Sequence, residues 1–383
     1  MKLTQTASLF AALALSFLLA ASASEAQISP AAATGTAPQA FQLSGDFRGT
    51  HDPSIAKDGD TYYVFATGAA YPPRQPGDHT PRPEDAMANG RAAPVMGQFP
   101  VRCSKDLHDW KFCGKVFPDI PAWIRALSPK TKELWAPDVS YFDGLYHLYY
   151  AFSVFGKNTS GIALATNKTL NPASPDYEWV DRGLVLKSAE QDDFNAIDPN
   201  LVLDAKGNAW LSFGSFWSGI KMRRIDRATG KLSMVDMKTY SLATRSKPED
   251  AAPAPPGLPP NWEAVEAPFV IRHGDFYYLF VSWDLCCRGA KSTYRTMVGR
   301  SAKVTGPYLD KQGKSMEDGG GSALLSGNTT WAGPGGESLL HLADGDIIVF
   351  HAYDARTGRP ALQISTLGWR NGWPSAALQG DPK

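Results

Sequence analysis

The stretch HDPSIAKDGDTYYVFATG, residues 51–68, carries the pattern on which the fold depends. It opens with a carboxylate beside a proline and passes through a short apolar run to a glycine-containing turn. It ends in a run of aromatic and branched residues. This pattern is typical of a strand, a tight turn and a second strand. The stretch therefore predicts a β-hairpin with an acidic residue, Asp52, at its open end.

Four further copies of this pattern follow along the chain. They are APDVSYFDGLYHLYYAFS from residue 136, IDPNLVLDAKGNAWLSFGSF from 197, EAPFVIRHGDFYYLFVSW from 266 and PGGESLLHLADGDIIVFHAY from 334. The copies start roughly 60 to 85 residues apart, and further strand-like segments lie between them, so each unit holds about four strands. Five four-stranded units predict an all-β fold, a five-bladed β-propeller. A pair of β-sandwiches would not explain five copies, and a parallel β-helix repeats over shorter periods.

The beginning of the chain predicts export. Lys2 is followed by an apolar run over residues 9–21 and then by small residues, which is typical of a secretory signal and too short for a comfortable membrane span. We assign residues 1–26 to the signal, 27–45 to a flexible lead and 46–383 to the propeller. The mature protein is therefore expected to be secreted or periplasmic.

Two segments rich in proline and charge interrupt the repeat, over residues 71–97 and 246–262. Both predict long loops. The first interrupts the first blade, and its position at the channel mouth would decide whether a long polymer has room to lie across the site.

The composition points to a neutral ligand. The chain has 38 basic and 38 acidic residues, which argues against nucleic acid or an anionic membrane as the main partner. Aromatic residues make up 11% of the chain and include 11 tryptophans. Most of them will form β core, but sugar rings stack on aromatic faces. A polysaccharide or oligosaccharide is therefore the expected partner, and the protein is expected to be a monomer.

The four cysteines fall into two pairs. Cys103 and Cys113 flank a predicted hairpin connection, so an exported protein could form a cross-strand disulfide here, but the sequence does not decide it. Cys286 and Cys287 are adjacent, and the sequence leaves open whether they are bridged or remain thiols. Neither pair has the spacing of a zinc site.

Carboxylates recur at the openings of the five units. They are Asp52, Asp138, Asp198, Glu266 and Glu337. In a propeller the first strand of each blade lines the central channel, so these groups are expected to meet at one mouth of it. Turn capping would explain any one of them, and a calcium site would explain several. The whole set favours a catalytic cleft, because glycoside hydrolysis needs one protonated and one ionised carboxyl group, and a third would keep the acid protonated.

The motifs HDPSI, LWAPDVS, NAIDPNLV, FGSFWSGI, VEAPFV and CCRGAKSTY occur in this order. Together they resemble family 43 of the glycoside hydrolases, and more narrowly its arabinanases, from about residue 45 to 374. The resemblance implies a five-bladed propeller with the active site at the channel mouth and an inverting mechanism. It implies Asp52 as general base, Glu266 as general acid, and Asp198 as the carboxylate that raises the pKa of the acid and orients substrate.

The expected activity is endo-cleavage of α-1,5-L-arabinan. Two alternatives stay open. One is an exo-acting α-L-arabinofuranosidase or a β-xylosidase on the same fold. The other is a carbohydrate-binding propeller without catalysis, which would be expected to lack one of the three carboxylates.

Other residues are placed by the motifs. Asp138 follows its proline directly and is expected to be structural. Many arabinanases have a metal-holding histidine where Gly336 stands, and Glu337 is expected to point to the opposite face, which leaves His351 as a substitute ligand. No cofactor is expected to be required, although a weakly bound calcium ion in the channel stays open. Near the cleft, the expected substrate contacts are Trp135, Phe155, Asn195, Ser215 and Trp217. The loop with Arg288, Ser292 and Tyr294 is also expected to reach it.

Overall fold

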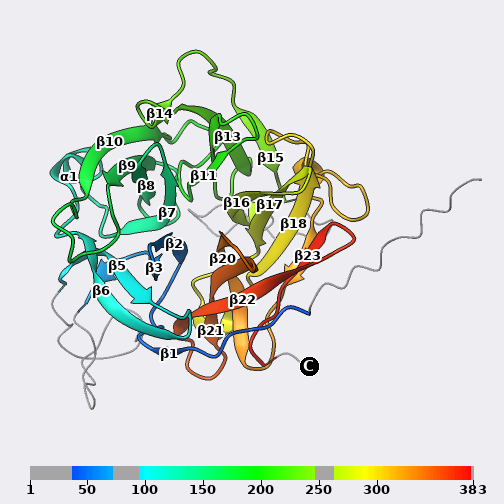
Figure 1. The fold of residues 1–383 in the computed structure, drawn as a ribbon. Helices are drawn as coiled ribbons and strands as arrows, with labels where there is room; N and C mark the ends of the chain where they lie inside the picture. Colours follow the sequence, from blue (N-terminus) through cyan, green and yellow to red (C-terminus); the bar gives the residue numbers. More distant parts are fainter. Residues whose placement is uncertain (1–36, 72–94, 246–262, 381–383) are drawn as a thin grey trace, which may run out of the picture. The chain divides into compact units, whose positions relative to one another are not determined.

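The computed structural model describes residues 37–71, 95–245 and 263–380, within a compact unit that spans residues 35–383. Five sheets follow one another along this part of the chain, antiparallel except for the pairing of β1 with β6, and they surround a common centre (Figure 1). The prediction of a five-bladed β-propeller is confirmed. Among the described residues, no helix has the length and apolar character needed to cross a membrane.

The first two blades take up the chain as far as residue 187. Blade 1 contains β1 (Ser44–Gly45), β2 (Ser54–Asp58), β3 (Thr61–Phe65), β4 (Ala69–Ala70), β5 (Gly97–Ser104) and β6 (Asp109–Phe117). A short helix, α1 (Ala122–Leu127), leads to the next blade. Blade 2 contains β7 (Leu134–Phe142), β8 (Leu145–Phe152), β9 (Gly161–Asn167) and β10 (Val180–Lys187).

The other three blades follow in the same manner. Blade 3 contains β11 (Asn200–Leu203), β12 (Ala209–Phe213), β13 (Ile220–Asp226), β14 (Lys231–Leu232) and β15 (Tyr240–Ala243). Blade 4 contains β16 (Val265–His273), β17 (Phe276–Trp283), β18 (Arg295–Ser301) and β19 (Ser322–Leu325), with the short 3₁₀ turns Gly289–Lys291 and Met316–Asp318 between strands. Blade 5 contains β20 (Trp331–Leu342), β21 (Gly345–Asp354), β22 (Pro360–Arg370) and β23 (Trp373–Ser375).

The hydrophobic core lies between neighbouring blades. The described core divides into five clusters, and each joins residues of two adjacent blades. Successive residues of a strand point to opposite faces of its sheet, so Tyr149 packs against blade 3 while Tyr150 packs against blade 1. Strands buried on both faces need apolar residues at nearly every position. This explains the unbroken aromatic and branched runs such as LYHLYYAF in β8.

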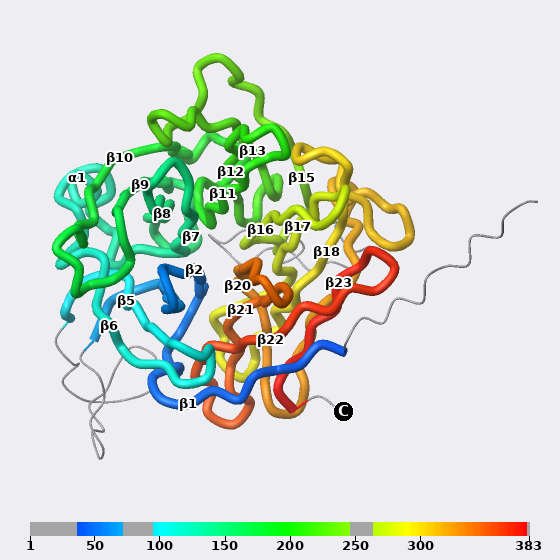
Figure 2. The backbone as a smooth tube through the Cα atoms, viewed as in Figure 1, coloured from blue at the N-terminus to red at the C-terminus, as the bar shows by residue number. Residues whose placement is uncertain are grey.

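The N-terminal segment closes the ring. Strand β1 pairs in parallel with β6 of blade 1, and the backbone N–H of Phe41 donates to Ile364 in β22 of blade 5 at 2.8 Å (Figure 2). We predicted a flexible lead over residues 27–45. For the described residues 37–45 this was wrong, because their backbone groups pair with two blades. Phe41 and Leu43 alternate with Gln42 and Ser44 and pack against the core between blades 1 and 5, but so short an alternation is a weak sequence signal.

Both cysteine pairs are bridged. Cys103 and Cys113 connect β5 to β6, with their Cα atoms 5.9 Å apart. Cys286 and Cys287 also form a disulfide, which settles the alternative that the sequence left open. The predicted signal at residues 1–26 and most of the two predicted long loops, at residues 72–94 and 246–262, lie outside the described residues.

Candidate active site

Each blade has, just before its inner strand or within the first half of it, a residue in the left-handed backbone region that lines the channel. These residues are Asp52, Ala136, Asp198, Ala267 and Gly336, with φ of 44°, 45°, 54°, 52° and 61°. Proline follows in the first four blades, and Glu337 follows in the fifth. The ten residues line one central cavity. A left-handed residue other than glycine costs about 1–2 kcal/mol, so its recurrence indicates a shared way of turning the chain into the channel wall.

The predicted carboxylates do not occupy equivalent positions, which corrects our expectation. Asp52 and Asp198 are themselves left-handed residues. Glu266 precedes its left-handed residue by one, whereas Glu337 follows by one and Asp138 by two. A shift of one residue along a strand turns a side chain to the other face. The sequence shows these offsets relative to the proline, which directly follows Asp52 and Asp198, lies two residues after Glu266 and directly precedes Asp138.

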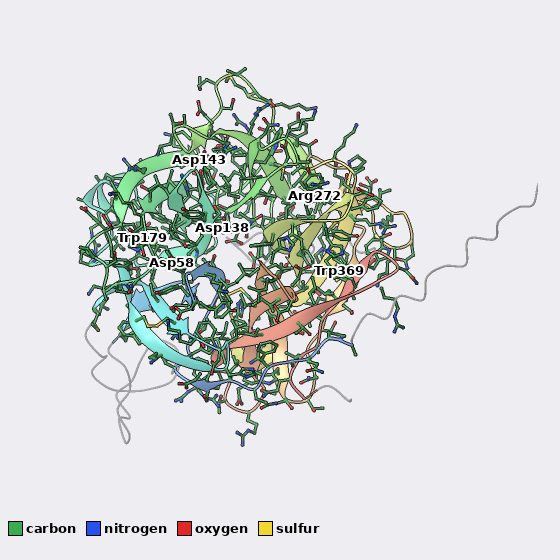
Figure 3. The ribbon with its side chains drawn as sticks, in the orientation of Figure 1. Asp58, Asp138, Asp143, Trp179, Arg272 and Trp369 are labelled. Carbon is green, nitrogen blue, oxygen red and sulfur yellow. A yellow bond between two sulfur atoms is a disulfide. The ribbon has the colours of Figure 1, made fainter. Side chains whose placement is uncertain are left out.

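Asp138 joins two blades. Its Oδ1 accepts from Asn200 Nδ2 at 3.0 Å, and its Oδ2 accepts from the backbone N–H of Leu201 at 2.9 Å. It lies near the centre of the ring (Figure 3) and is almost fully buried, and burial raises its pKa to about 6. Ser54, Asn200 and Ser338 make the corresponding bond to the next blade at 2.9, 2.9 and 3.2 Å. The structural role expected for Asp138 is therefore supported.

Glu337 also lies between blades. It is 5% exposed, and its Oε2 accepts from Ser282 Oγ at 2.9 Å and from Thr296 Oγ1 at 3.3 Å, both in blade 4. Burial raises its pKa to about 7, although these hydrogen bonds act in the opposite direction. Its carboxyl group therefore joins blade 4 to blade 5, where Phe269 replaces the polar residue that makes the interblade bond elsewhere.

Glu266 is held by two hydroxyl groups. Ser215 Oγ donates to its Oε2 and the Tyr294 hydroxyl donates to its Oε1, both at 2.6 Å. The side chain is 9% exposed, and burial is the largest influence that raises its pKa. The charge of Asp52 adds to this rise, whereas the two hydroxyl groups oppose it. A carboxyl group of this kind retains its proton at a pH at which an exposed glutamate has lost it.

Asp198 is the neighbour with which Glu266 is coupled. Burial raises the pKa of Asp198 well above its usual value, and the charge of Glu266 raises it further. The one described hydrogen bond to its carboxylate comes from the backbone N–H of Ala267, the residue after Glu266, at 3.1 Å. Because two nearby carboxyl groups cannot both ionise easily, they share their titration, and the proton belongs to the pair.

Asp52 has the opposite character. Burial raises its pKa, but His51, His351 and the Thr67 hydroxyl outweigh burial, and the pKa lies well below the usual range. Thr67 Oγ1 donates to Asp52 Oδ2 at 2.6 Å, and His51 Nδ1 lies 3.0 Å from the same oxygen. The low pKa keeps the carboxylate ionised, and because the side chain is 25% exposed, it is accessible to solvent.

The expected substrate contacts divide into two groups. Asn195 and Ser215 are buried and already engaged: the Asn195 amide oxygen accepts from Ser160 at 2.7 Å, and Ser215 holds Glu266. Trp135 directly precedes its left-handed residue, the position that Glu266 has in blade 4, and is partly exposed. Phe155 is 72% exposed, in the loop between β8 and β9. Trp217 is partly exposed and left-handed itself.

The hydrogen bonds of Thr67 to Asp52 and of Tyr294 to Glu266 were not predicted from the sequence. Thr67 was missed altogether, and Tyr294 was expected in the cleft without a partner. Thr67 follows β3, and its Oγ1 both donates to Asp52 and accepts the backbone N–H of Ala136 at 2.7 Å. The threonine of the ATG motif carries no signal by itself, because only the pairing of β2 with β3 brings it beside Asp52.

The channel around Gly336 does not fit the histidine-held metal ion expected of relatives. A Cβ atom at Gly336 would lie 2.8 Å from Asp52 Oδ1 and 2.9 Å from the His351 ring, so the space for a side chain is taken. His351 is fully buried, and its Nδ1 faces the backbone N–H of Asp52 at 3.2 Å, which counts against it as a substitute ligand. Asp52 and the two neighbouring imidazoles offer one carboxylate, whereas calcium takes six to eight oxygen ligands.

The site therefore combines a carboxylate that is held ionised, Asp52, with two carboxyl groups that share a proton, Asp198 and Glu266. Asp52 comes from blade 1, Asp198 from blade 3 and Glu266 from blade 4, and all three meet at one end of the central channel. Opposed pKa shifts in one site are the mark of an acid and base pair. In a β-propeller whose chain carries no net charge, such a pair meets the chemical requirement of a glycoside hydrolase.

Comparison with known proteins supports the assignment to the glycoside hydrolases. The family model described as glycosyl hydrolases family 43 matches residues 48–374, and the chain belongs to this family. The extracellular exo-α-(1→5)-L-arabinofuranosidase ArbA of Cellvibrio japonicus is 42% identical over 329 residues, which are 85% of each chain. The extracellular endo-α-(1→5)-L-arabinanase 1 of Bacillus subtilis is 40% identical over 327 residues, which are 85% of this chain and 87% of that one.

Solved structures show the same fold. The α-L-arabinanase of Cellvibrio cellulosa in complex with arabinohexaose superposes with a TM-score of 0.72 at 38% identity, and the match covers 87% of this chain and 96% of that one. The chain is thus a glycosidase, and the chemistry of such an enzyme uses two carboxyl groups.

Proposed function

We propose that this protein is an arabinanase that hydrolyses α-1,5-linked L-arabinan within the chain, by inversion at the anomeric carbon. The observation that carries the proposal is the opposed protonation of Asp52 and Glu266 at the channel mouth. Relatives named for activity on α-1,5-linked arabinan at 40% and 42% identity support the substrate.

Each carboxyl group has one step in this mechanism. Glu266 donates its proton to the glycosidic oxygen as the bond to the leaving sugar breaks. Asp52, ionised, takes a proton from the water that attacks the anomeric carbon from the opposite face. Asp198 keeps the proton on Glu266 through like-charge repulsion and orients the bound sugar. Exposed Trp135, Phe155 and Trp217 provide apolar faces for neighbouring sugar rings.

Exo-action is the alternative, because a relative of that name is as similar as the endo-acting one. The two activities share their proton chemistry and differ in what the loops at the channel mouth admit. Linear arabinan with a blocked non-reducing end separates them. An endo-enzyme releases a series of oligosaccharides early and lowers the viscosity quickly, whereas an exo-enzyme releases nothing from the blocked chain. Failure to release any product from linear arabinan would contradict the substrate itself.

We further propose that the protein is exported by its signal over residues 1–26 and acts as a monomer. The extracellular names of two relatives support export. N-terminal sequencing of the exported protein tests the cleavage site, and sedimentation tests the oligomeric state.

A further inference from the structure

The disulfide between adjacent Cys286 and Cys287 lies beside the candidate base. It belongs to the loop between β17 and β18, and Cys287 is exposed. Its Sγ lies 3.8 Å from Nε2 of His51, the residue that precedes Asp52. The loop is closed at its base by a hydrogen bond from Thr293 N–H to the Leu285 carbonyl at 2.9 Å. The bridge therefore lies against the histidine that precedes Asp52.

The bridge fixes one particular hydrogen-bond donor. A disulfide between adjacent residues closes a small ring, and this ring contains the peptide N–H of Cys287. That N–H donates to the Tyr353 hydroxyl at 2.9 Å. A backbone N–H only donates, so the tyrosine oxygen must accept here. Its own hydrogen is then free for His51 Nε2, which lies 2.6 Å away.

This order of donors sets the tautomer of His51. If neutral His51 accepts at Nε2, its proton resides on Nδ1, which lies 3.0 Å from Asp52 Oδ2. If His51 is protonated, Nδ1 carries a proton as well. In both forms an N–H points at the carboxylate of Asp52. The imidazole of His351, stacked on that of His51 with ring centres 3.8 Å apart, holds the ring in this orientation.

We propose that the Cys286–Cys287 disulfide, through Tyr353 and His51, positions the carboxylate of Asp52, so that full turnover requires the oxidised bridge. The inference rests on the proposed role of Asp52 as general base. The bridge, Tyr353 and His51 are positioning groups in this scheme, since they act on the reaction only through Asp52. A carboxylate that is free to rotate meets the attacking water less often, which lowers kcat and leaves substrate affinity nearly unchanged.

The first test removes one hydroxyl group. Tyr353→Phe is expected to lower kcat roughly 10-fold on linear arabinan while KM changes less than about 2-fold, because a single hydrogen bond in the chain is lost. Tyr308→Phe is the matched control: its hydroxyl is also buried and donates to a backbone carbonyl, that of Val304, at 2.7 Å. An unchanged kcat in Tyr353→Phe, or a lower melting temperature alone, would overturn the proposal.

The second test opens the bridge. A water-soluble phosphine converts the disulfide to two thiols and is itself oxidised to the phosphine oxide, with water supplying the oxygen. The double variant Cys103→Ala/Cys113→Ala serves as the background, so that one disulfide responds. We expect reduction to lower kcat as Tyr353→Phe does, and to leave kcat unchanged when Tyr353→Phe is present. Equal losses in both backgrounds, or no loss in either, contradict the chain of contacts.

A readout without substrate separates this inference from the proposed function. ¹⁵N NMR of the histidine rings reports which nitrogen of His51 carries the proton. We expect Nδ1–H in the oxidised protein and a mixture of tautomers after reduction or in Tyr353→Phe. If the tautomer changes as expected but the wild type does not cleave arabinan, only the proposed substrate is refuted. If the His51 signals are the same before and after reduction, the positioning of Asp52 through Tyr353 and His51 is refuted.

Discussion

Tyr294→Phe is expected to raise the pKa of Glu266 and to move the alkaline limit of activity upwards. The Tyr294 hydroxyl donates to Glu266 Oε1 at 2.6 Å, and this bond favours the ionised carboxylate. A hydrogen bond to a charged group contributes about 1.5–3 kcal/mol, and one pKa unit corresponds to about 1.4 kcal/mol. Losing the bond therefore raises the pKa by about 1–2 units. The acid then keeps its proton to a correspondingly higher pH.

The substitution is otherwise conservative. The Tyr294 ring packs so closely on Gly335 that a Cβ atom there would lie 2.4 Å from it, and phenylalanine retains this contact. The assay is kcat against pH on linear arabinan, from pH 4 to about 10. Tyr278→Phe is the control, because its hydroxyl donates to the backbone carbonyl of Gly372 at 2.6 Å, outside the site. An alkaline limb that stays in place or moves to lower pH would show that the reasoning about Glu266 is wrong.

Asp198→Asn is expected to lower the pKa of Glu266, because it removes a like charge, and the alkaline limb of kcat should move to lower pH as activity falls. An unmoved limb would mean that Asp198 orients the substrate without affecting the acid. Asp52→Ala and Glu266→Ala are each expected to lower kcat by about 10²–10⁴-fold with a native circular dichroism spectrum, and retention of more than about a tenth of kcat would exclude the assigned role. The pKa of Glu337 is about 7 in the folded protein, above its value in the unfolded chain, so the protonated side chain stabilises the fold fully below about pH 4.5 and this contribution is lost as the pH rises through 7. Glu337→Gln should therefore reduce the fall in melting temperature between pH 5 and 8. An unchanged slope would contradict this. Activity is expected to survive exhaustive chelation, whereas a loss restored by added calcium would refute the argument from Gly336. Proton NMR of the first-formed sugar should show the inverted anomer, and a retained anomer would exclude Asp52 as a base that activates water.

The five blades could be predicted from the sequence because the residues that specify each hairpin lie close together in the chain. A turn and two runs of apolar residues specify a hairpin without reference to the rest of the chain, and five such hairpins predicted the propeller. The resemblance singled out Asp52, Asp198 and Glu266 from the other acids. Their environments were harder to foresee, since Thr67 and Tyr294 reach the carboxyl groups only after strands have paired.

The position of each acid relative to its proline can be read from the sequence, but the direction of its side chain cannot. Asp138 directly follows Pro137, and its carboxylate holds neighbouring blades together; Glu266 lies two residues before Pro268, and its carboxyl group is held by Ser215 and Tyr294. Strands β7 and β16 each have a bulge here, where the pairing register shifts between Trp135 and Asp138 and between Glu266 and Phe269, and the two acids stand at opposite ends of it. Alternation fails at a bulge, so counting residues from the proline does not give the direction of a side chain.

Closure of the ring by the N-terminal segment determines when the site can exist. The Gln39 N–H donates to the Thr366 hydroxyl, a contact across 327 positions of sequence. The earliest part of the folded unit to be synthesised must therefore wait for nearly the last. Contacts of such separation form slowly, because a long loop has to close before they gain any energy. Asp52 lies just beyond this segment, so in a growing chain the candidate base and acid stay in separate, unjoined blades until the strand that carries Thr366 has been made.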